Sequence, residues 1–315
     1  MFPPSFLKRF LRPILPKEHR NLPGSVGIPM SLGTHLDQFR LVRCLSPNPS
    51  SKSSLVYLAE SAEWGQCILK ILLPQASQQD CDRHSLERGT LQTLSLSTGL
   101  RIPNLLDSGT TEDGFAYFAT EYIEAPSLLS KSNLVADWPL AERLAAIRSI
   151  ASLLAEIHRL GYIHNDLSPA NVLISNSTNA HLIDFGIATE IDSPVSERKM
   201  ITGSPAVISP EAIRREPTST CSDIYALGCL GFLVLNGRLP YEGRTPVEIL
   251  WKHLNAEPET SLDLHETGER HCEAAEEASL LVKSCMSKER SDRPASASEA
   301  AEQFGTILAR LDSPR

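Results

Sequence analysis

Three oxygen-bearing side chains lie in one short stretch of the sequence, between Tyr162 and Gly186. Asp166 is followed five positions later by Asn171, and Asp184 stands directly before a Phe-Gly pair. A carboxylate can accept the proton of a hydroxyl group, and carboxylate and amide oxygens are the hard ligands that Mg²⁺ binds. Phosphoryl transfer from a nucleotide needs both an oriented acceptor hydroxyl and a metal that neutralises phosphate charge. The stretch therefore indicates phosphoryl-transfer chemistry.

A short loop and a β-hairpin are expected to position these three groups. Residues 172–174 and 181–183 have the apolar character of strands, and the Ser- and Asn-rich residues between them have turn character. The loop before the first strand carries Asp166 and Asn171, and the second strand leads directly into Asp184. An ordinary hairpin with polar loop residues is the alternative explanation of the same pattern.

This stretch resembles the catalytic loop and the metal-binding Asp-Phe-Gly motif of the protein kinases. The resemblance implies that Asp166 orients and deprotonates the acceptor hydroxyl, and that Asn171 and Asp184 hold Mg²⁺. Two positions depart from the usual pattern H-R-D-L-K-P-x-N, because Asn165 stands in place of Arg and Ser168 in place of Lys. Since Ser168 cannot neutralise the γ-phosphate, we expect the transfer to be slower by roughly 10²–10³-fold.

The replacement at position 165 leads to a hypothesis about regulation. In many kinases the Arg at this position pairs with a phosphate on the activation segment. Because Asn165 carries no positive charge, we predict that phosphorylation of this segment is not required for activity. The segment resembling it follows Gly186 and closes at residues 203–211, with Ser209 in place of the usual Ala. Its candidate phosphorylation sites are Ser193, Ser196, Thr202 and Ser204.

Residues 39–124 are predicted to form a small, β-rich lobe. Alternating and β-branched residues predict three antiparallel strands at 39–45, 54–60 and 66–72. Lys70 ends the third strand and matches the family lysine that holds the α- and β-phosphates. Glu87 lies in a predicted helix and would be the carboxylate that orients Lys70. The predicted apolar face of that helix consists of Leu86, Thr90, Leu91 and Leu94.

The resemblance also implies a nucleotide pocket with two unusual features. The connection at residues 46–54 has no glycine, whereas kinases carry here a glycine-rich loop whose backbone amides cover the phosphates. Its Pro47 and Pro49 have no N–H to donate. Ile68 replaces the Ala usual above the adenine, and Thr120 would be the gatekeeper. The residues implied to bind the nucleotide are Val56, Ile68, Lys70, Thr120, Glu121, Ile123, Ser127 and Leu173, with the backbones of Glu121 and Ile123 on adenine.

Residues 125–312 are predicted to form a larger, helical lobe. One helix is expected to begin at Pro139 and end at Gly161, because apolar residues recur between them at three- and four-residue steps. The most apolar run, residues 224–235, is too short to span a bilayer and suits a buried core helix.

Several side chains of this lobe are expected to have structural roles. By resemblance, Asp223 would accept backbone amides of the catalytic loop, and Arg293 would form a buried ion pair with Glu211. His164 is expected to pack under Phe185 rather than to act as a base.

Composition is typical of a globular protein with ordinary hydrophobic (41%) and charged (22%) fractions. A chain of 315 residues is long enough to form two separate cores. The net charge of −8 gives no indication of nucleic-acid binding. Seven cysteines without a C-x-x-C spacing favour reduced thiols and a cytoplasmic location.

Residues 1–38 are predicted to be a basic, proline-containing, flexible tail. Residues 1–36 carry five basic residues against Glu18 alone, and basic residues and prolines interrupt their apolar run, which makes a poor signal peptide. Residues 1–20 could also form a weak membrane or partner contact. No segment is long enough for a transmembrane helix.

Together the motifs identify the chain as a member of the protein kinase family, with an α+β, bilobal fold, and most similar to the eukaryotic-like Ser/Thr kinases of bacteria. The expected reaction is Mg²⁺- and ATP-dependent phosphorylation of protein Ser or Thr hydroxyls in signalling. The preference for Ser/Thr over Tyr rests on the similarity of residues 203–205 to the Ser/Thr-type docking loop.

Two alternatives belong to different functional classes. A pseudokinase would use the fold to bind partners with little turnover, and the glycine-free connection, Ile68 and Ser168 favour it. A small-molecule phosphotransferase would share the catalytic Asp and the metal ligands but would generally lack the docking segment at 203–211.

Overall fold

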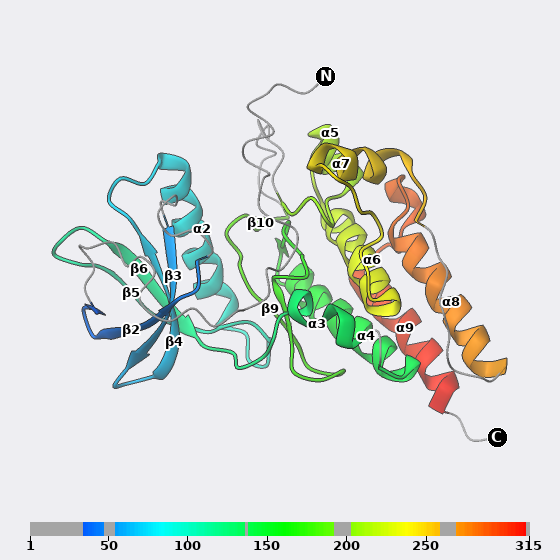
Figure 1. Cartoon of the computed structure of the whole chain (residues 1–315), viewed down its shortest axis with the longest axis horizontal. Helices are drawn as coiled ribbons and strands as arrows, with labels where there is room; N and C mark the ends of the chain where they lie inside the picture. The colour runs from blue at the N-terminus through cyan, green and yellow to red at the C-terminus, as the bar shows by residue number, and fades with distance from the viewer. Residues whose placement is uncertain (1–33, 47–53, 136–137, 192–202, 259–268, 313–315) are drawn as a thin grey trace. The chain divides into compact units, whose positions relative to one another are not determined.

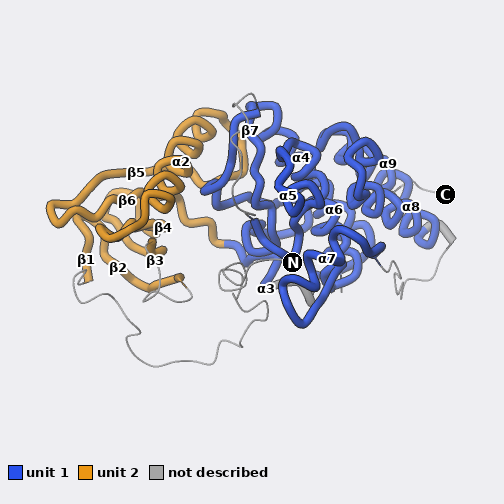
Figure 2. The backbone as a smooth tube through the Cα atoms, turned by 90° about the horizontal axis from the view of Figure 1, so that it is seen from above, with its two compact units in different colours: residues 1–16, 125–315 blue, residues 17–124 orange. Residues whose placement is uncertain are grey.

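The computed structural model describes residues 34–46, 54–135, 138–191, 203–258 and 269–312 (Figure 1). They fall into two compact units, one up to Glu124 and the other from Ala125 onward (Figure 2). The predicted tail up to residue 33, most of the glycine-free connection and the candidate sites Ser193, Ser196 and Thr202 lie outside the described residues.

The described residues of the first unit form a six-stranded antiparallel sheet with the order β1-β2-β3-β4-β6-β5. Three of its strands are those predicted from alternation, namely β2 (Phe39–Cys44), β3 (Ser54–Ser61) and β4 (Gly65–Leu72). A further strand, β6 (Ala116–Glu121), lies near the end of the unit and carries Thr120 and Glu121. Sequence reasoning missed the edge strands β1 (His35–Leu36) and β5 (Leu105–Thr110).

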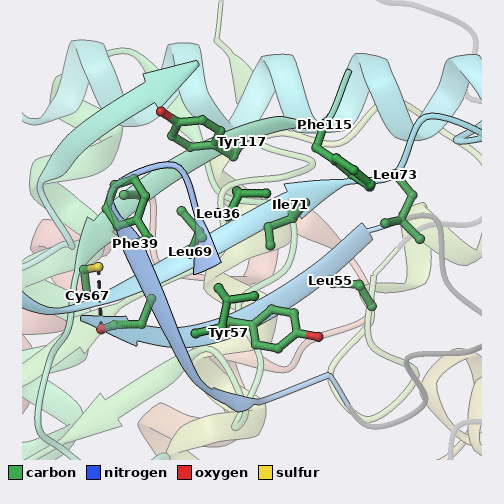
Figure 3. Close-up of a cluster of buried hydrophobic side chains, with 13 residues drawn as sticks. Leu36, Phe39, Leu55, Tyr57, Cys67, Leu69, Ile71, Leu73, Phe115 and Tyr117 are labelled. Atoms are coloured by element: carbon green, nitrogen blue, oxygen red, sulfur yellow. Dashed lines mark hydrogen bonds between the residues drawn. The ribbon is translucent and has the colours of Figure 1, made fainter. Parts of the chain in front are cut away.

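One face of this sheet carries the core of the unit (Figure 3). Leu55, Tyr57, Leu69 and Ile71 alternate along β3 and β4 and are buried there with aromatic residues of neighbouring strands. Cys67 packs in the same cluster, and its Sγ lies 3.7 Å from the carbonyl oxygen of Ala59. Because side chains alternate between the two faces of a strand, the residues between these positions point to the opposite face.

Helix α2 (Gln78–Leu94) begins at Ser77, whose Oγ accepts a hydrogen bond from the backbone N–H of Asp80. Its buried side chains are His84, Glu87, Thr90, Leu91 and Leu94. The prediction that Leu86 belongs to this face was wrong, because 42% of Leu86 is exposed. Two polar side chains, His84 and Glu87, are also buried, and Glu87 was expected on this side as the carboxylate that orients Lys70.

The second unit is largely helical (Figure 1). Its described helices include α3 (Leu128–Val135), α4 (Leu140–Arg159), α5 (Pro210–Arg214), α6 (Thr220–Asn236), α7 (Pro246–Asn255), α8 (Glu269–Cys285) and α9 (Ala297–Asp312). Helix α4 packs against α6 and α9, and α8 packs against both of these. The helix predicted between Pro139 and Gly161 is α4, and Gly161 follows it with a φ of +88°.

Helix α6 is the buried helix that the apolar run predicted. Gly228 allows α8 to approach it closely, because a Cβ at this position would lie 2.8 Å from the Cβ of Cys285, the last residue of α8. Within the described residues, no helix combines the length and the apolar character needed to cross a bilayer.

Two short antiparallel pairs position the residues of interest in the second unit. Strands β8 (Val172–Ile174) and β9 (Ala180–Leu182) form the predicted hairpin, with the second strand one residue earlier than expected. Strand β7 (Tyr162–Ile163) pairs with β10 (Thr189–Glu190), which brings the segment after Gly186 back to the beginning of the stretch.

Candidate active site

The side chains of Asp166 and Asn171 are directly hydrogen-bonded. Nδ2 of Asn171 donates to the carbonyl oxygen of Asp166 at 2.9 Å and to its Oδ2 at 3.2 Å. The backbone N–H of Asn171 donates to the carbonyl of Ser168 at 2.9 Å, which closes the loop between them. With its nitrogen turned toward Asp166, Asn171 presents Oδ1 as the atom that can bind a cation, and no described residue donates to that oxygen.

The β8–β9 hairpin brings Asp184 next to Asn171 in the fold. The backbone N–H of Ile183 donates to the carbonyl of Asn171 at 2.9 Å, so Asp184 continues the strand that lies beside it. Asp184 has a φ of +68°, a conformation that Asp tolerates better than most residues. Its exposed carboxylate accepts the N–H of Gly186 at 3.4 Å.

The donor set formed by Asn171 and Asp184 fits Mg²⁺. It offers one amide oxygen and one carboxylate, and no group of three or more His, Cys, Asp or Glu side chains within the described residues forms an all-protein metal site. Mg²⁺ is commonly held by one or two carboxylates together with substrate phosphates and water, rather than by a complete protein cage. This donor set therefore suits a metal that arrives with a nucleotide.

The segment at residues 203–211, which was expected to dock the substrate, contacts the second oxygen of Asp166. The backbone N–H of Ser204 donates to Oδ1 of Asp166 at 3.1 Å. The preceding Gly203 has a φ of +107°, and a Cβ there would lie 3.3 Å from the carbonyl oxygen of Asn165. Sequence reasoning missed this contact, although the glycine before Ser204 was a signal that the backbone comes close to another segment.

Asp223 accepts backbone N–H groups of the loop that carries Asp166, as predicted. Its Oδ2 accepts the N–H of His164 at 2.8 Å and Nε2 of His158 at 2.9 Å, and its Oδ1 accepts the N–H of Asn165 at 2.8 Å. Burial opposes ionisation of this carboxyl, but the hydrogen bonds from the side chain of His158 and from the backbone N–H of His164 outweigh it, so the pKa of Asp223 lies below its usual value. The loop is thus held by a buried carboxylate with three donors.

His164 has the structural role predicted for it. The residue is fully buried, and its ring lies 4.8 Å from the ring of Phe185, measured between centroids. Burial lowers the pKa of His164, although the charges of Asp223 and Asp184 partly oppose the shift. Its Nδ1 accepts the backbone N–H of Asp166 at 3.3 Å, which requires the neutral imidazole with the proton on Nε2.

In the first unit, Lys70 and Glu87 form an ion pair between β4 and α2. The two side chains are 18% and 8% exposed, so water screens the pair only weakly. Nζ of Lys70 lies 6.0 Å from the centroid of the Phe118 ring, and that ring packs against His84. Sequence reasoning did not single out Phe118, although it precedes Thr120 by two positions and so shares its face of the strand.

Register places four of the predicted nucleotide-binding side chains on one face of the sheet. Val56 lies opposite Lys70, and Ile68 lies opposite both Leu58 and Thr120. These residues alternate with the buried core residues, so they occupy the face opposite the core. Glu87 of α2 lies at the same face, where its carboxylate forms the ion pair with Lys70.

The remaining predicted nucleotide contacts divide between the two units. Glu121 ends β6, and its N–H donates to the carbonyl of Asn104 at 2.9 Å, so a backbone contact to a ligand must use its carbonyl oxygen. Ile123 is half-buried and follows that strand. In the second unit, Ser127 and Leu173 form a β-bridge with each other.

The described ends of the glycine-free connection are hydrogen-bonded. Oγ of Ser46 accepts the backbone N–H of Val56 at 2.9 Å, and the N–H of Leu45 donates to the carbonyl of Val56 at 2.8 Å. A serine hydroxyl thus closes the hairpin, while residues 47–53 lie outside the described part of the chain.

Comparison with known proteins gives one consistent result. The family model described as "Protein kinase domain" matches residues 52–304. A serine/threonine-protein kinase, pkn2 of Myxococcus xanthus, is 32% identical over 86% of this chain and 33% of that protein. The serine/threonine-protein kinase PrkC of Bacillus subtilis is 38% identical over 50% of this chain and 24% of that protein. A third, pkn3 of Myxococcus xanthus, is 33% identical over 67% of this chain and 39% of that protein. The chain thus spans well under half the length of these relatives.

Proposed function

Because this chain belongs to the protein kinase family and resembles its bacterial Ser/Thr members, we propose that it transfers the γ-phosphate of ATP to Ser or Thr hydroxyls of protein substrates. The observation that carries the proposal is the arrangement around Asp166. Its carboxylate oxygens accept hydrogen bonds from the Asn171 amide and from the N–H of Ser204. These donors fix the orientation of a carboxylate that would accept the proton of the substrate hydroxyl.

The second unit would also hold the metal. The Oδ1 atom of Asn171 and the carboxylate of Asp184 are hard oxygen donors that the β8–β9 hairpin places on adjacent strands. When bound, Mg²⁺-ATP supplies the phosphoryl group and neutralises its charge. The contribution of the chain is to keep these two oxygens and Asp166 in fixed positions through backbone hydrogen bonds.

The first unit would hold the phosphates and the base of the nucleotide. Lys70 would bind the α- and β-phosphates, and Glu87 would keep its ammonium group in place. Val56, Ile68 and Thr120 share the sheet face of Lys70 and would contact adenine, together with the backbones of Glu121 and Ile123. Ser127 and Leu173 of the second unit complete the proposed set.

A transfer assay tests the proposal. Purified protein is incubated with Mg²⁺ and radiolabelled ATP in the presence of a generic protein substrate, and the assay is repeated with Asp166→Asn and with excess chelator. We expect Asp166→Asn to lower kcat by about 10²–10⁴-fold and the chelator to stop transfer. Phosphoamino-acid analysis should give phosphoserine or phosphothreonine. Transfer that persists at full rate in Asp166→Asn would contradict the proposed mechanism.

A pseudokinase is the second candidate, and Ser168 is the observation that favours it. The side chain is uncharged and buried where the family carries the lysine that neutralises the γ-phosphate. A thermal-shift measurement with Mg²⁺-ATP separates the two functions. Stabilisation by nucleotide without Asp166-dependent transfer would indicate a binding scaffold. A small-molecule kinase is disfavoured by the docking segment, whose Ser204 directly contacts Asp166.

The cytoplasm is the proposed compartment of the reaction. All seven cysteines are described, and each is a free thiol. Three of them, Cys67, Cys229 and Cys285, are buried in the cores, where burial raises the pKa of each thiol and keeps it unreactive. Free thiols and a nucleotide substrate both suit a reducing, ATP-containing compartment.

A further inference from the structure

The side chain of Asn165 joins three segments of the second unit. Its Nδ2 donates to Oγ1 of Thr189 at 2.9 Å and to the carbonyl of Ile187 at 3.2 Å, both in the segment that follows Gly186. Its Oδ1 accepts a hydrogen bond from Oγ1 of Thr218 at 2.8 Å, in the loop before α6. A longer contact of 3.4 Å joins Nδ2 to the carbonyl of Ile163 in β7.

These acceptors determine the orientation of the amide. Two carbonyl oxygens, those of Ile163 and Ile187, lie on the Nδ2 side. The reversed amide would place Oδ1 against both of them, and an oxygen cannot donate to a carbonyl. Only an amide in the described orientation satisfies all three segments, because it donates on one side and accepts from Thr218 on the other.

The backbone at position 165 adds a second constraint. Asn165 has a φ of +62°, a left-handed conformation that Asn and Gly adopt more readily than other residues. Its N–H donates to the buried carboxylate of Asp223 at 2.8 Å. The next residue is Asp166, so the position and direction of the Asp166 backbone depend on how residue 165 is held.

A small cavity lies beside this network. It has a volume of about 20 Å³, and its lining includes Asn165, Asp166, Ser204, Thr218 and Asp223. This volume corresponds to about one water molecule. Side chains of the network thus form part of the wall of this cavity.

We propose that Asn165 is a positioning residue for the transfer reaction. Its neutral hydrogen bonds to Thr189 and Thr218 hold the adjacent Asp166 in a fixed position relative to the segments that carry these two threonines. The inference rests on the proposed function and deepens it. The side-chain bonds of Asn165 need no cation and no phosphate, since every partner of the amide is a hydroxyl or a backbone carbonyl. Asn165 lacks the positive charge of the Arg that is usual at this position. Its amide instead connects to the segment after Asp184 through hydrogen bonds.

Two substitutions at this position separate the side chain from the backbone. Asn165→Gly keeps access to the left-handed backbone and removes all side-chain hydrogen bonds. Asn165→Asp keeps the size but places a carboxylate oxygen against the carbonyls of Ile163 and Ile187. We expect kcat to fall by about 10-fold in the first variant and about 10²-fold in the second, while KM for ATP changes by less than about 3-fold. Equal kcat values in the two variants and the wild type would overturn the proposal.

Asn236 provides a matched control. It is a half-buried asparagine of the same unit whose Nδ2 donates to the carbonyl of Phe232 at 2.9 Å, within α6. Asn236→Asp should lower the midpoint of thermal unfolding and leave kcat within about 2-fold of the wild type. If Asn236→Asp lowers kcat as much as Asn165→Asp does, the effect reflects general destabilisation, and the positioning role is refuted.

A double-mutant cycle tests the specific bond. Thr189→Val removes the acceptor of the shortest Nδ2 bond and should lower kcat by about 3–10-fold in the wild type. In the Asn165→Gly background it should change kcat by less than about 2-fold, because the bond is already absent. Strict additivity of the two substitutions would contradict the proposed coupling.

Hydrogen exchange distinguishes a failure of this inference from a failure of the proposed function. The backbone N–H groups of residues 187–191 are followed in the wild type and in Asn165→Gly without nucleotide, so the measurement needs no catalysis. Faster exchange in the variant, confined to this segment and the catalytic loop, supports the positioning role even in a chain that transfers no phosphate. Unchanged exchange overturns it, whatever the transfer assay gives.

Discussion

The guanidinium of Arg293 and the carboxylate of Glu211 form a bidentate pair that is almost completely buried. Nη1 lies 2.8 Å from Oε1 and Nη2 lies 2.9 Å from Oε2, and the side chains are 0% and 1% exposed. Burial opposes the charge of Glu211, but the hydrogen bonds from Arg293 and Ser222 outweigh it and lower the pKa of this carboxyl. The pair, which was predicted by resemblance, ties α5 to the segment that precedes α9.

Removal of one partner should be strongly destabilising. Arg293→Met leaves the Glu211 carboxylate buried without its bidentate partner. Among the described side chains, only the hydroxyl of Ser222 at 2.7 Å and the more distant Nε of Arg290 at 3.9 Å remain, and we expect the free energy of unfolding to fall by about 3–5 kcal/mol. The matched control is Arg310→Met, which removes an exposed ion pair in which Nη1 of Arg310 contacts both carboxylate oxygens of Glu277. That change should cost at most about 1 kcal/mol. Chemical denaturation measures both, and similar losses in the two variants would contradict the assignment.

The Lys70–Glu87 pair should control nucleotide use. Lys70→Met should lower kcat/KM for ATP by about 10²–10³-fold, because a preorganised cation is lost. Glu87→Gln keeps the shape of the side chain and should have a smaller effect in the same direction. Arg40→Met removes an exposed ion pair with Glu60 in the same sheet and serves as the control. Steady-state kinetics with varied ATP would contradict the prediction if Arg40→Met and Lys70→Met behaved alike.

Activity should not depend on phosphorylation of the chain. The contacts of Asn165 are made by neutral groups, so no phosphate is needed to balance a charge at this position. A sample treated with phosphatase, and shown by mass spectrometry to be free of phosphate, should retain most of its transfer activity. Loss of nearly all activity on this treatment would show that a phosphate orders the segment after Asp184.

Stability should fall on mild acidification, partly because of His253. Its Nδ1 lies 2.8 Å from the hydroxyl of Tyr225, and its ring packs edge-on against Tyr241. Burial, and secondarily the charge of Lys288, lower the pKa of His253 to about 3. The unfolded chain takes up this proton near pH 6.5, whereas the folded chain does not, so stability is complete above that pH and falls below it.

The size of this effect can be measured by denaturation at several pH values. Between pH 7 and pH 5, His253 alone should account for a loss of about 2 kcal/mol. His253→Gln should make the pH dependence shallower, although His84 and His164, whose pKa values are also lowered by burial, still contribute in the same direction. Parallel pH profiles of the variant and the wild type would contradict the prediction.

Sequence reasoning succeeded where the signal was local. One loop and one hairpin contain Asp166, Asn171 and Asp184. Their short separation along the chain therefore makes them close in space. Helix α6 was predictable for a similar reason, because a continuous apolar run suits a helix that is buried on all sides.

The missed contacts of the candidate site depend on partners that are distant in sequence. Asn165 bonds to Thr218, 53 residues away, and nothing in the pattern around position 165 indicates that partner. Ser204 reaches Asp166 across 38 residues. The prediction that Leu86 faces inward on α2 was wrong. The inward face of α2 is set by Lys70 of β4, which pairs with Glu87, rather than by the periodicity of the helix itself.

Side chains of β3, β4 and β6 alternate between the two faces of the sheet, and this has a consequence for the evolution of the protein. Val56, Ile68 and Thr120 project away from the packed cluster that contains Leu55, Leu69 and Ala119. If this face binds the nucleotide as proposed, replacements in the first trio alter which nucleotides or inhibitors it accepts while the hydrophobic interior stays intact. Replacements in the second trio disturb folding before they affect selectivity. Under the proposed function, nucleotide preference can therefore change through replacements at the outward-facing positions of these strands. The buried positions between them do not tolerate such replacements.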